Sequence, residues 1–111
     1  MPAFCDVALP VPLDQSFTYS IPAGFAPVLG GRVLVPFRRE QMSGVVVRLH
    51  DDPPAMETRP LQQVVDIEPI LPDHLIELAL WVAQYYVAPL GEVLRTMLPM
   101  ERLRTLRISS P

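Results

Sequence analysis

Aromatic, hydroxyl and arginine side chains lie next to one another at two places in the first half of the chain. One is the segment Phe17-Thr18-Tyr19, and in the other Arg38 and Arg39 follow an aromatic residue directly. An aromatic ring can stack on an unpaired nucleobase for about 1–3 kcal/mol, and a guanidinium can bind a phosphate through two parallel hydrogen bonds. These residue types could therefore hold a short nucleic-acid end at one local patch.

Each of these residues also has a purely structural alternative. Phe17 and Tyr19 share one face of an alternating segment, so both rings could pack in the core, and this is the interpretation we favour for Tyr19. Thr18 lies on the opposite face and is the better candidate for a ligand contact. The arginines could simply be solvated surface residues, with Arg38 and Arg39 the strongest candidates for another role.

No other residues form a catalytic or metal-binding pattern. Cys5, His50 and His74 are too few and too scattered for a zinc site. All nine basic residues are arginine, so Gly30-Gly31 is not followed by the lysine of a nucleotide-phosphate loop. The serines have no histidine at a recognisable spacing for nucleophilic catalysis. We expect a chain that is not an enzyme and that binds no metal or cofactor.

Composition limits the classes of protein that the chain can belong to. With 111 residues, half of them hydrophobic, it has the size and apolar content of one globular domain. The single cysteine and the absence of a signal sequence favour the cytoplasm, and no apolar run is long enough for a membrane span. The net charge is −3, with basic stretches at 32–48 and 95–107 flanking an acidic middle. Such a surface cannot grip a long duplex by counterion release.

The first two thirds of the sequence predict short strands separated by glycine and proline. The expected strands are Ala3–Leu9, Ser16–Ile21, Arg32–Pro36, Met42–Leu49 and Leu61–Ile67, with a proline-rich loop over Asp51–Pro60. Strands this short, joined by such turns, favour a small curled antiparallel sheet or barrel.

From Asp73 onward the hydrophobic period becomes helical. Asp73 could cap a helix that follows Pro72, and Pro89 would end it. The helix is apolar around so much of its circumference that we expect it to pack on more than one side. Trp81 lies on its more polar stripe, either as an interface anchor or packed under a second short helix at Leu90–Leu98. The expected fold class is therefore α+β, a small β-rich antiparallel sheet or barrel with one longer and one short C-terminal helix.

Several segments together resemble a known family. They are VALPVPL at residues 7–13, FTY at Phe17–Tyr19, VPF at Val35–Phe37 and LALWVAQYYVAPLGEVLRTMLP at Leu78–Pro99. In order and spacing they are similar to the N-terminal domain of the bacterial replication-restart helicase PriA (primosomal protein N′). The resemblance implies a PriA-like DNA-binding domain over residues 1–100 and a linker over 101–111.

The resemblance also implies which parts of the family lie outside this sequence. In the family this domain precedes a winged helix, two helicase lobes and a zinc-binding insert, and ATP, Mg²⁺ and zinc belong to those parts. The implied partners are branched or forked DNA with a 3′ end, the remaining domains of PriA, single-stranded-DNA-binding protein and other primosome proteins. The implied location is the nucleoid.

In the family this module binds the 3′ end of the nascent leading strand. Transferred to this sequence, the implied pocket residues are Phe17, Thr18, Arg38 and Gln62, with Arg39 beside Arg38. Thr18 replaces an acid, Arg38 a glycine and Gln62 a lysine, and we expect Arg38 and Arg39 to restore part of the lost positive charge. The resemblance thus predicts end binding without base-sequence preference. The alternative is a structural or protein-interaction domain of the same helicase, in which this pocket has degenerated.

Overall fold

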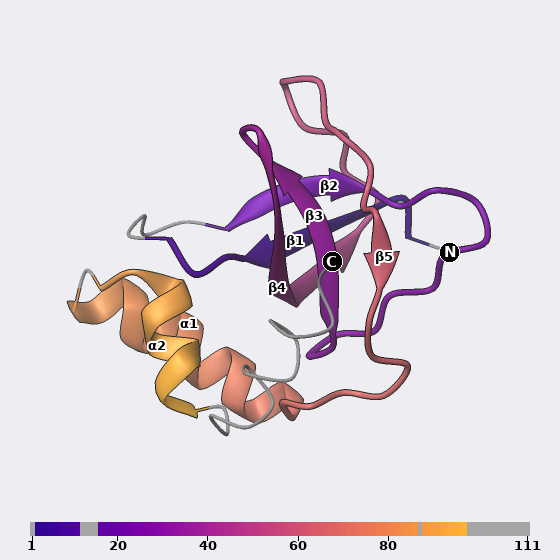
Figure 1. The fold of residues 1–111 in the computed structure, drawn as a ribbon. Helices are drawn as coiled ribbons and strands as arrows, with labels where there is room; N and C mark the ends of the chain where they lie inside the picture. The colour runs from indigo at the N-terminus through magenta and orange to yellow at the C-terminus, as the bar shows by residue number, and fades with distance from the viewer. Residues whose placement is uncertain (1, 12–15, 87, 98–111) are drawn as a thin grey trace.

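The computed structural model describes residues 2–11, 16–86 and 88–97, which form five strands followed by two helices (Figure 1). The strands are β1 (Phe4–Ala8), β2 (Phe17–Ser20), β3 (Arg32–Phe37), β4 (Glu40–His50) and β5 (Gln63–Val64). The helices are α1 (Asp73–Tyr86) and α2 (Leu90–Met97). This arrangement confirms the predicted α+β class, whereas the predicted linker at 101–111 lies outside the described residues.

The strands form one antiparallel sheet in the order β2-β1-β4-β3-β5. Its two edges are joined by the segment 59–62. On the β2 side, the amide of Ser20 donates to the carbonyl of Arg59 (3.1 Å), and the amide of Leu61 donates to the carbonyl of Ser20 (3.0 Å). On the β3 side, the amide of Gln62 donates to the carbonyl of Leu34 (2.8 Å). The sheet is therefore curled into a small barrel. Because this segment divides its hydrogen bonds between two strands, the strand expected over Leu61–Ile67 is reduced to β5.

A bulge in β4 decides which side chains face outward. Asp6 pairs with Arg48 while Val7 pairs with Val46, so Val47 is the extra residue. The bulge lets Val47 and Arg48 both lie on the outer face, since Val46 and Leu49 pack in the barrel interior. It thus creates a polar outer position beside β1 without interrupting the core.

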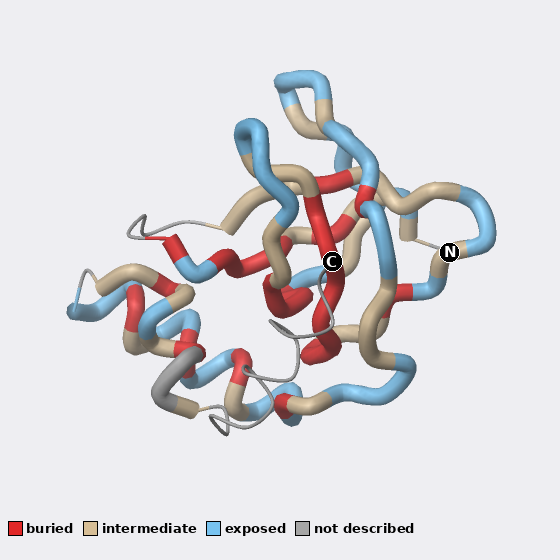
Figure 2. The backbone as a smooth tube through the Cα atoms, in the orientation of Figure 1, coloured by how far each residue is buried: buried red, intermediate tan, exposed pale blue. Residues whose placement is uncertain are grey.

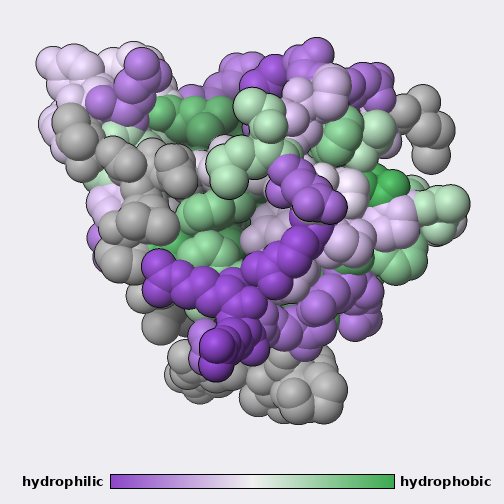
Figure 3. Space-filling model, turned by 90° about the horizontal axis from the view of Figure 1, so that it is seen from above, coloured by the Kyte–Doolittle hydropathy of each residue, from purple (hydrophilic) through white to green (hydrophobic). Residues whose placement is uncertain are grey.

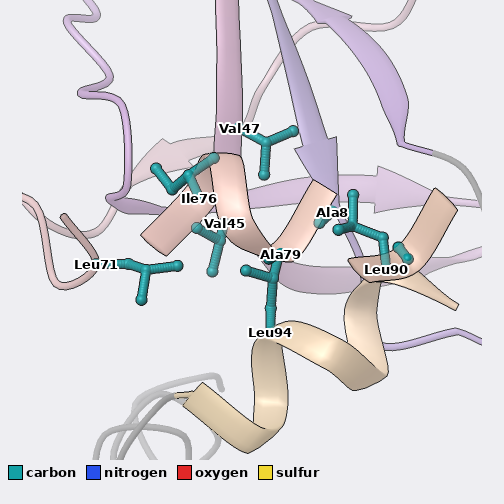
Figure 4. Packing of buried hydrophobic residues seen from close by; sticks show 9 residues of the cluster. Ala8, Val45, Val47, Leu71, Ile76, Ala79, Leu90 and Leu94 are labelled. Carbon is teal, nitrogen blue, oxygen red and sulfur yellow. The ribbon is translucent and has the colours of Figure 1, made fainter. Parts of the chain in front are cut away.

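Two apolar clusters hold the domain together. The barrel interior contains inward-facing residues of the strands, including Cys5, Val7, Tyr19, Val35 and Val46. The second cluster lies between the outer face of the sheet and the two helices (Figure 4), and it consists of Ala8, Val45, Val47, Leu71, Ile76, Ala79, Ala83, Leu90 and Leu94. Figure 2 shows that the buried residues lie along the central strands and the inner sides of the helices, while the two loops that project furthest from the barrel are exposed.

The helices differ from the sequence expectations in two ways. Pro72, and not Asp73, supplies the first helical acceptor of α1, since its carbonyl accepts from the amide of Ile76 (3.1 Å). Asp73 is the first helical residue, where its charge favours the positive end of the helix dipole. The expectation that α1 packs on several sides is wrong. Its buried residues are Ile76, Ala79 and Ala83, all on one face.

The second helix packs very closely against the barrel. A Cβ atom on Gly91 would clash with the backbone carbonyl of Leu9, which follows β1. A glycine at this position therefore lets the backbone of α2 approach the end of β1, and any larger residue would push the helix away.

Burial of Cys5 is expected to lower the stability of the domain at alkaline pH. Burial, and secondarily the Asp6 carboxylate, raises the pKa of the Cys5 thiol from its ordinary 9.0 to about 12. The folded state thus keeps a proton that the unfolded chain releases above pH 9. We expect the free energy of unfolding to be unaffected by this group below that pH and to fall by about 1.4 kcal/mol per pH unit between the two values.

Urea unfolding at a series of pH values measures this loss. Below pH 9 Cys5→Ala lowers the free energy of unfolding because it leaves a cavity, and above pH 9 it should flatten the alkaline slope. Burial also raises the pKa of Tyr19, so part of the slope remains in the variant. An unchanged slope in Cys5→Ala would show that the thiol is not its source.

Candidate nucleic-acid interface

The hairpin between β3 and β4 is the most exposed basic feature of the barrel. Its loop consists of Arg38 and Arg39 alone, and both are exposed. Arg38 has a φ of 58°, in the left-handed region that glycine adopts more readily than any other residue. The backbone geometry at this position therefore suits a glycine, which the resemblance implies for the family, better than the arginine found here.

Two phenylalanine rings meet at the base of this hairpin. The rings of Phe17 and Phe37 lie edge to face, with centroids 5.0 Å apart and planes at 71°. Both side chains are half-buried, so part of their surface remains accessible. The guanidinium carbon of Arg38 lies 5.3 Å from the Phe37 centroid, within the range of a cation–π contact. Aromatic surface and positive charge are thus adjacent.

Tyr19 belongs to the core, as expected. It is 5% exposed, and its hydroxyl donates to the carbonyl of Pro36 at 2.8 Å. This bond ties β2 to β3 across the barrel and holds the strand that carries Phe17 against the hairpin.

Arg59 and Gln62 reach the same end of the barrel from the segment that closes it. Arg59 Nη1 donates to the carbonyl of Arg38 at 3.2 Å, and Gln41 Nε2 donates to Gln62 Oε1 at 2.6 Å. We call Phe17, Phe37, Arg38, Arg59 and Gln62 the hairpin-end cluster. It joins residues from β2, β3, the hairpin loop and the closing segment.

The charge around this cluster is positive although the chain is anionic. Arg38, Arg39 and Arg59 are exposed there, and the nearest acid along the hairpin is Glu40. Seen from above, this end of the molecule shows strongly hydrophilic residues lying across and around apolar ones (Figure 3). The arrangement can combine base stacking with phosphate contacts at a single place.

Thr18 lies apart from the cluster, on the outer face of β2. Its hydroxyl donates to Asp6 Oδ1 at 2.7 Å, and Asp6 also bonds His50 Nε2 at 2.9 Å. Arg48 Nη1 is 3.9 Å from the same carboxylate. The structure therefore places Thr18 in a polar network on β1, β2 and β4, where its hydroxyl already has a partner.

The tautomer of His50 follows from its two contacts. The amide of Asp52 donates to Nδ1 at 3.2 Å, so Nδ1 is an acceptor and Nε2 carries the proton that is donated to Asp6. The network is satisfied internally, and its carboxylates would repel a phosphate.

Of the predicted site residues, Phe17 and Arg38 both lie against Phe37, and Gln62 bonds Gln41 on the same hairpin. Arg39 is exposed beside Arg38, and Thr18 faces away toward Asp6. Sequence reasoning missed Phe37 and Arg59 as members. The available signal for Arg59 was its position as the single arginine of the acidic middle, immediately before Pro60. The partner of this arginine depends on how the barrel closes, which the local sequence pattern does not reveal.

The described residues form neither a metal site nor a membrane-spanning helix. Within the described ranges no three histidine, cysteine or acidic side chains gather as a metal ion would require. Neither of the described helices is long and apolar enough to cross a bilayer.

Comparison with known proteins identifies the family. Residues 6–99 match the PriA family described as the 3′ DNA-binding domain (3′BD). Replication restart protein PriA of Haemophilus influenzae is 34% identical over 97 residues, covering 86% of this chain and 13% of that protein. PriA of Buchnera aphidicola from Schizaphis graminum is 30% identical over 95 residues, covering 84% of the chain and 13% of that protein.

A third relative extends the match further along the chain. PriA of Treponema pallidum is 33% identical over 115 residues, covering 96% of the chain and 18% of that protein. The chain thus spans less than a fifth of the length of each of these relatives. It belongs to the family of the 3′ DNA-binding domain of PriA.

Proposed function

We propose that the hairpin-end cluster binds the 3′ end of a DNA strand at an arrested or branched replication fork, without base-sequence preference. Membership of the 3′ DNA-binding domain family supports a DNA-binding role in replication restart. The observation that carries the finer proposal is the Phe17–Phe37 pair bordered by three exposed arginines in a chain of net charge −3. Positive charge concentrated at one place suits one nucleotide better than a long duplex.

The chemistry of the cluster supports discrimination of an end from the interior of a strand. A terminal base is free to stack on the accessible part of Phe17, and Arg38 and Arg59 could pair with the phosphate on its 5′ side. Gln62 Oε1 and the Arg38 carbonyl are hydrogen-bond acceptors, so they suit a 3′ hydroxyl, which can donate. A phosphate at that position has no proton to donate near neutral pH and would be repelled by these oxygens.

The domain would act within a longer PriA polypeptide. ATP-dependent unwinding, with its ATP, Mg²⁺ and zinc, would belong to other parts of that polypeptide. Contacts with single-stranded-DNA-binding protein and other primosome proteins could use those parts as well.

A second candidate function is a structural or protein-interaction domain with a degenerated end pocket. The observation that favours it is the engagement of Thr18 with Asp6, which removes one implied contact from the cluster. This candidate predicts no dependence of binding on the chemistry of the DNA end.

Fluorescence anisotropy with three forked oligonucleotides separates the two functions. Their 3′ ends carry a hydroxyl, a phosphate, or a hairpin that blocks the end. We expect the hydroxyl end to bind about tenfold more tightly than the other two, the factor that corresponds to about 1.4 kcal/mol. Equal binding to all three, or no binding to any, would remove the end-recognition proposal and leave the second candidate.

A further inference from the structure

Helix α1 carries a largely apolar face that the other described residues do not cover. His74, Leu78, Trp81 and Tyr85 are spaced by four, three and four residues, so they lie along one line of the helix. This line is opposite the face of Ile76, Ala79 and Ala83 that packs on the sheet. We call these four residues the α1 stripe.

The stripe is exposed and its aromatic part is already ordered. Leu78, Trp81 and Tyr85 are 46%, 56% and 65% exposed. This exposure excludes the alternative that Trp81 packs under α2. The rings of Trp81 and Tyr85 are stacked instead, with centroids 5.0 Å apart and planes at 11°. Tryptophan and tyrosine dominate the centres of protein interfaces, and stacked rings lose little conformational freedom on binding.

The charges of α1 favour a protein and disfavour DNA. The helix contains Asp73 and Glu77 and no lysine or arginine. A polyphosphate strand would be repelled by these carboxylates, whereas an apolar protein surface with basic residues at its border would complement them. The helices also lie on the opposite side of the molecule from the β3–β4 hairpin (Figure 1), so DNA at the hairpin-end cluster would leave the stripe free.

The lengths of the relatives indicate where such a surface would come from. This chain matches 13% of the Haemophilus influenzae protein, so most of that polypeptide lies outside the match and is covalently connected to the matching segment. A tethered surface has a high effective concentration, which lets even a modest apolar contact persist. From these observations we infer that the α1 stripe is the docking face for a basic-bordered apolar surface in the remaining part of a PriA polypeptide.

Photo-crosslinking in a chimaeric PriA tests the inference. This chain replaces the segment of Haemophilus influenzae PriA that it matches, and benzoylphenylalanine replaces Trp81. We expect cross-links within one polypeptide, to peptides outside this domain. The matched control carries the same cross-linker at Ile67, which is 86% exposed and is not in α1, and it should give none of these products. Cross-links to a second copy, to added DNA, or to nothing would overturn the inference.

A second variant controls for misfolding. Trp81→Glu should leave the thermal unfolding midpoint of the isolated 111-residue chain nearly unchanged, because the ring is exposed. In the chimaera we expect it to accelerate protease cleavage between this domain and the rest by about tenfold. Equal cleavage of both chimaeras would contradict docking through the stripe. Trp81→Glu should not change the preference of the isolated chain for DNA ends. Failure of the docking inference is therefore distinguishable from failure of the proposed function.

Discussion

Replacing Phe17 by leucine is expected to weaken binding of 3′-hydroxyl DNA ends by about 1–3 kcal/mol, which is roughly 5- to 150-fold. Leucine keeps most of the apolar volume that packs against Phe37 and the barrel interior, but it offers no aromatic face to a base. The loss should therefore fall on stacking and leave the fold intact. Anisotropy titration with the three forked oligonucleotides measures it.

The matched control is Phe25→Leu. Phe25 also packs on the barrel interior, but it lies in the turn after β2, where its amide donates to the Pro22 carbonyl. Both variants should lose comparable amounts of stability in urea, and only Phe17→Leu should lose affinity for the end. If both variants bind alike, stacking on Phe17 does not contribute to recognition.

Replacing Asp66 by alanine is expected to lower the free energy of unfolding by about 3–5 kcal/mol. Asp66 Oδ2 lies 2.6 Å from Arg32 Nε, and the two side chains are only 14% and 9% exposed. The same carboxylate also accepts from Arg32 Nη2 and from the Arg32 amide. Its removal takes away the charge that compensates a buried guanidinium and loosens the chain after β5 from β3.

Asp52→Ala provides the comparison for that prediction. Asp52 forms an ion pair with Arg48 at 3.6 Å, but its side chain is 82% exposed. Water and salt screen this pair, so we expect less than about 1 kcal/mol from its loss. Chemical denaturation of both variants at neutral pH measures the difference. A similar small loss in both would mean that burial adds nothing to the Arg32–Asp66 pair.

The elements of the fold were largely predictable because their signals are local. Short apolar segments bounded by glycine and proline in β1 to β4, and the change to a helical period at Asp73, depend on neighbours in sequence. The segment after Pro60 was not predictable in the same way. Its backbone bonds divide between Ser20 on β2 and Leu34 on β3, and only the closed barrel brings those two strands near each other.

The candidate site was also only partly predictable from the sequence. Phe17, Arg38 and Gln62 were identified through resemblance, and the structure brings them to one end of the barrel. The alternation of β2 correctly put Thr18 on the opposite face, but it could not show that Asp6 would occupy its hydroxyl. Arg59 could not be assigned at all, because its partner is a backbone carbonyl 21 residues away.

The exposure of the α1 stripe could not be predicted from the hydrophobicity of the helix. An all-round apolar helix predicted burial on several sides, yet Trp81 and Tyr85 are exposed. Hydrophobicity shows that a surface favours burial, but not whether this domain or another surface covers it.

By itself, therefore, the sequence determined the secondary structure, the family and the types of side chain available for binding. Only the tertiary structure decided which of them lie together, since strand order, the β4 bulge and barrel closure arise from contacts between residues far apart in the chain. Those contacts gather Phe37 and Arg59 with Phe17, turn Thr18 toward Asp6, and leave Leu78, Trp81 and Tyr85 on α1 exposed among the described residues.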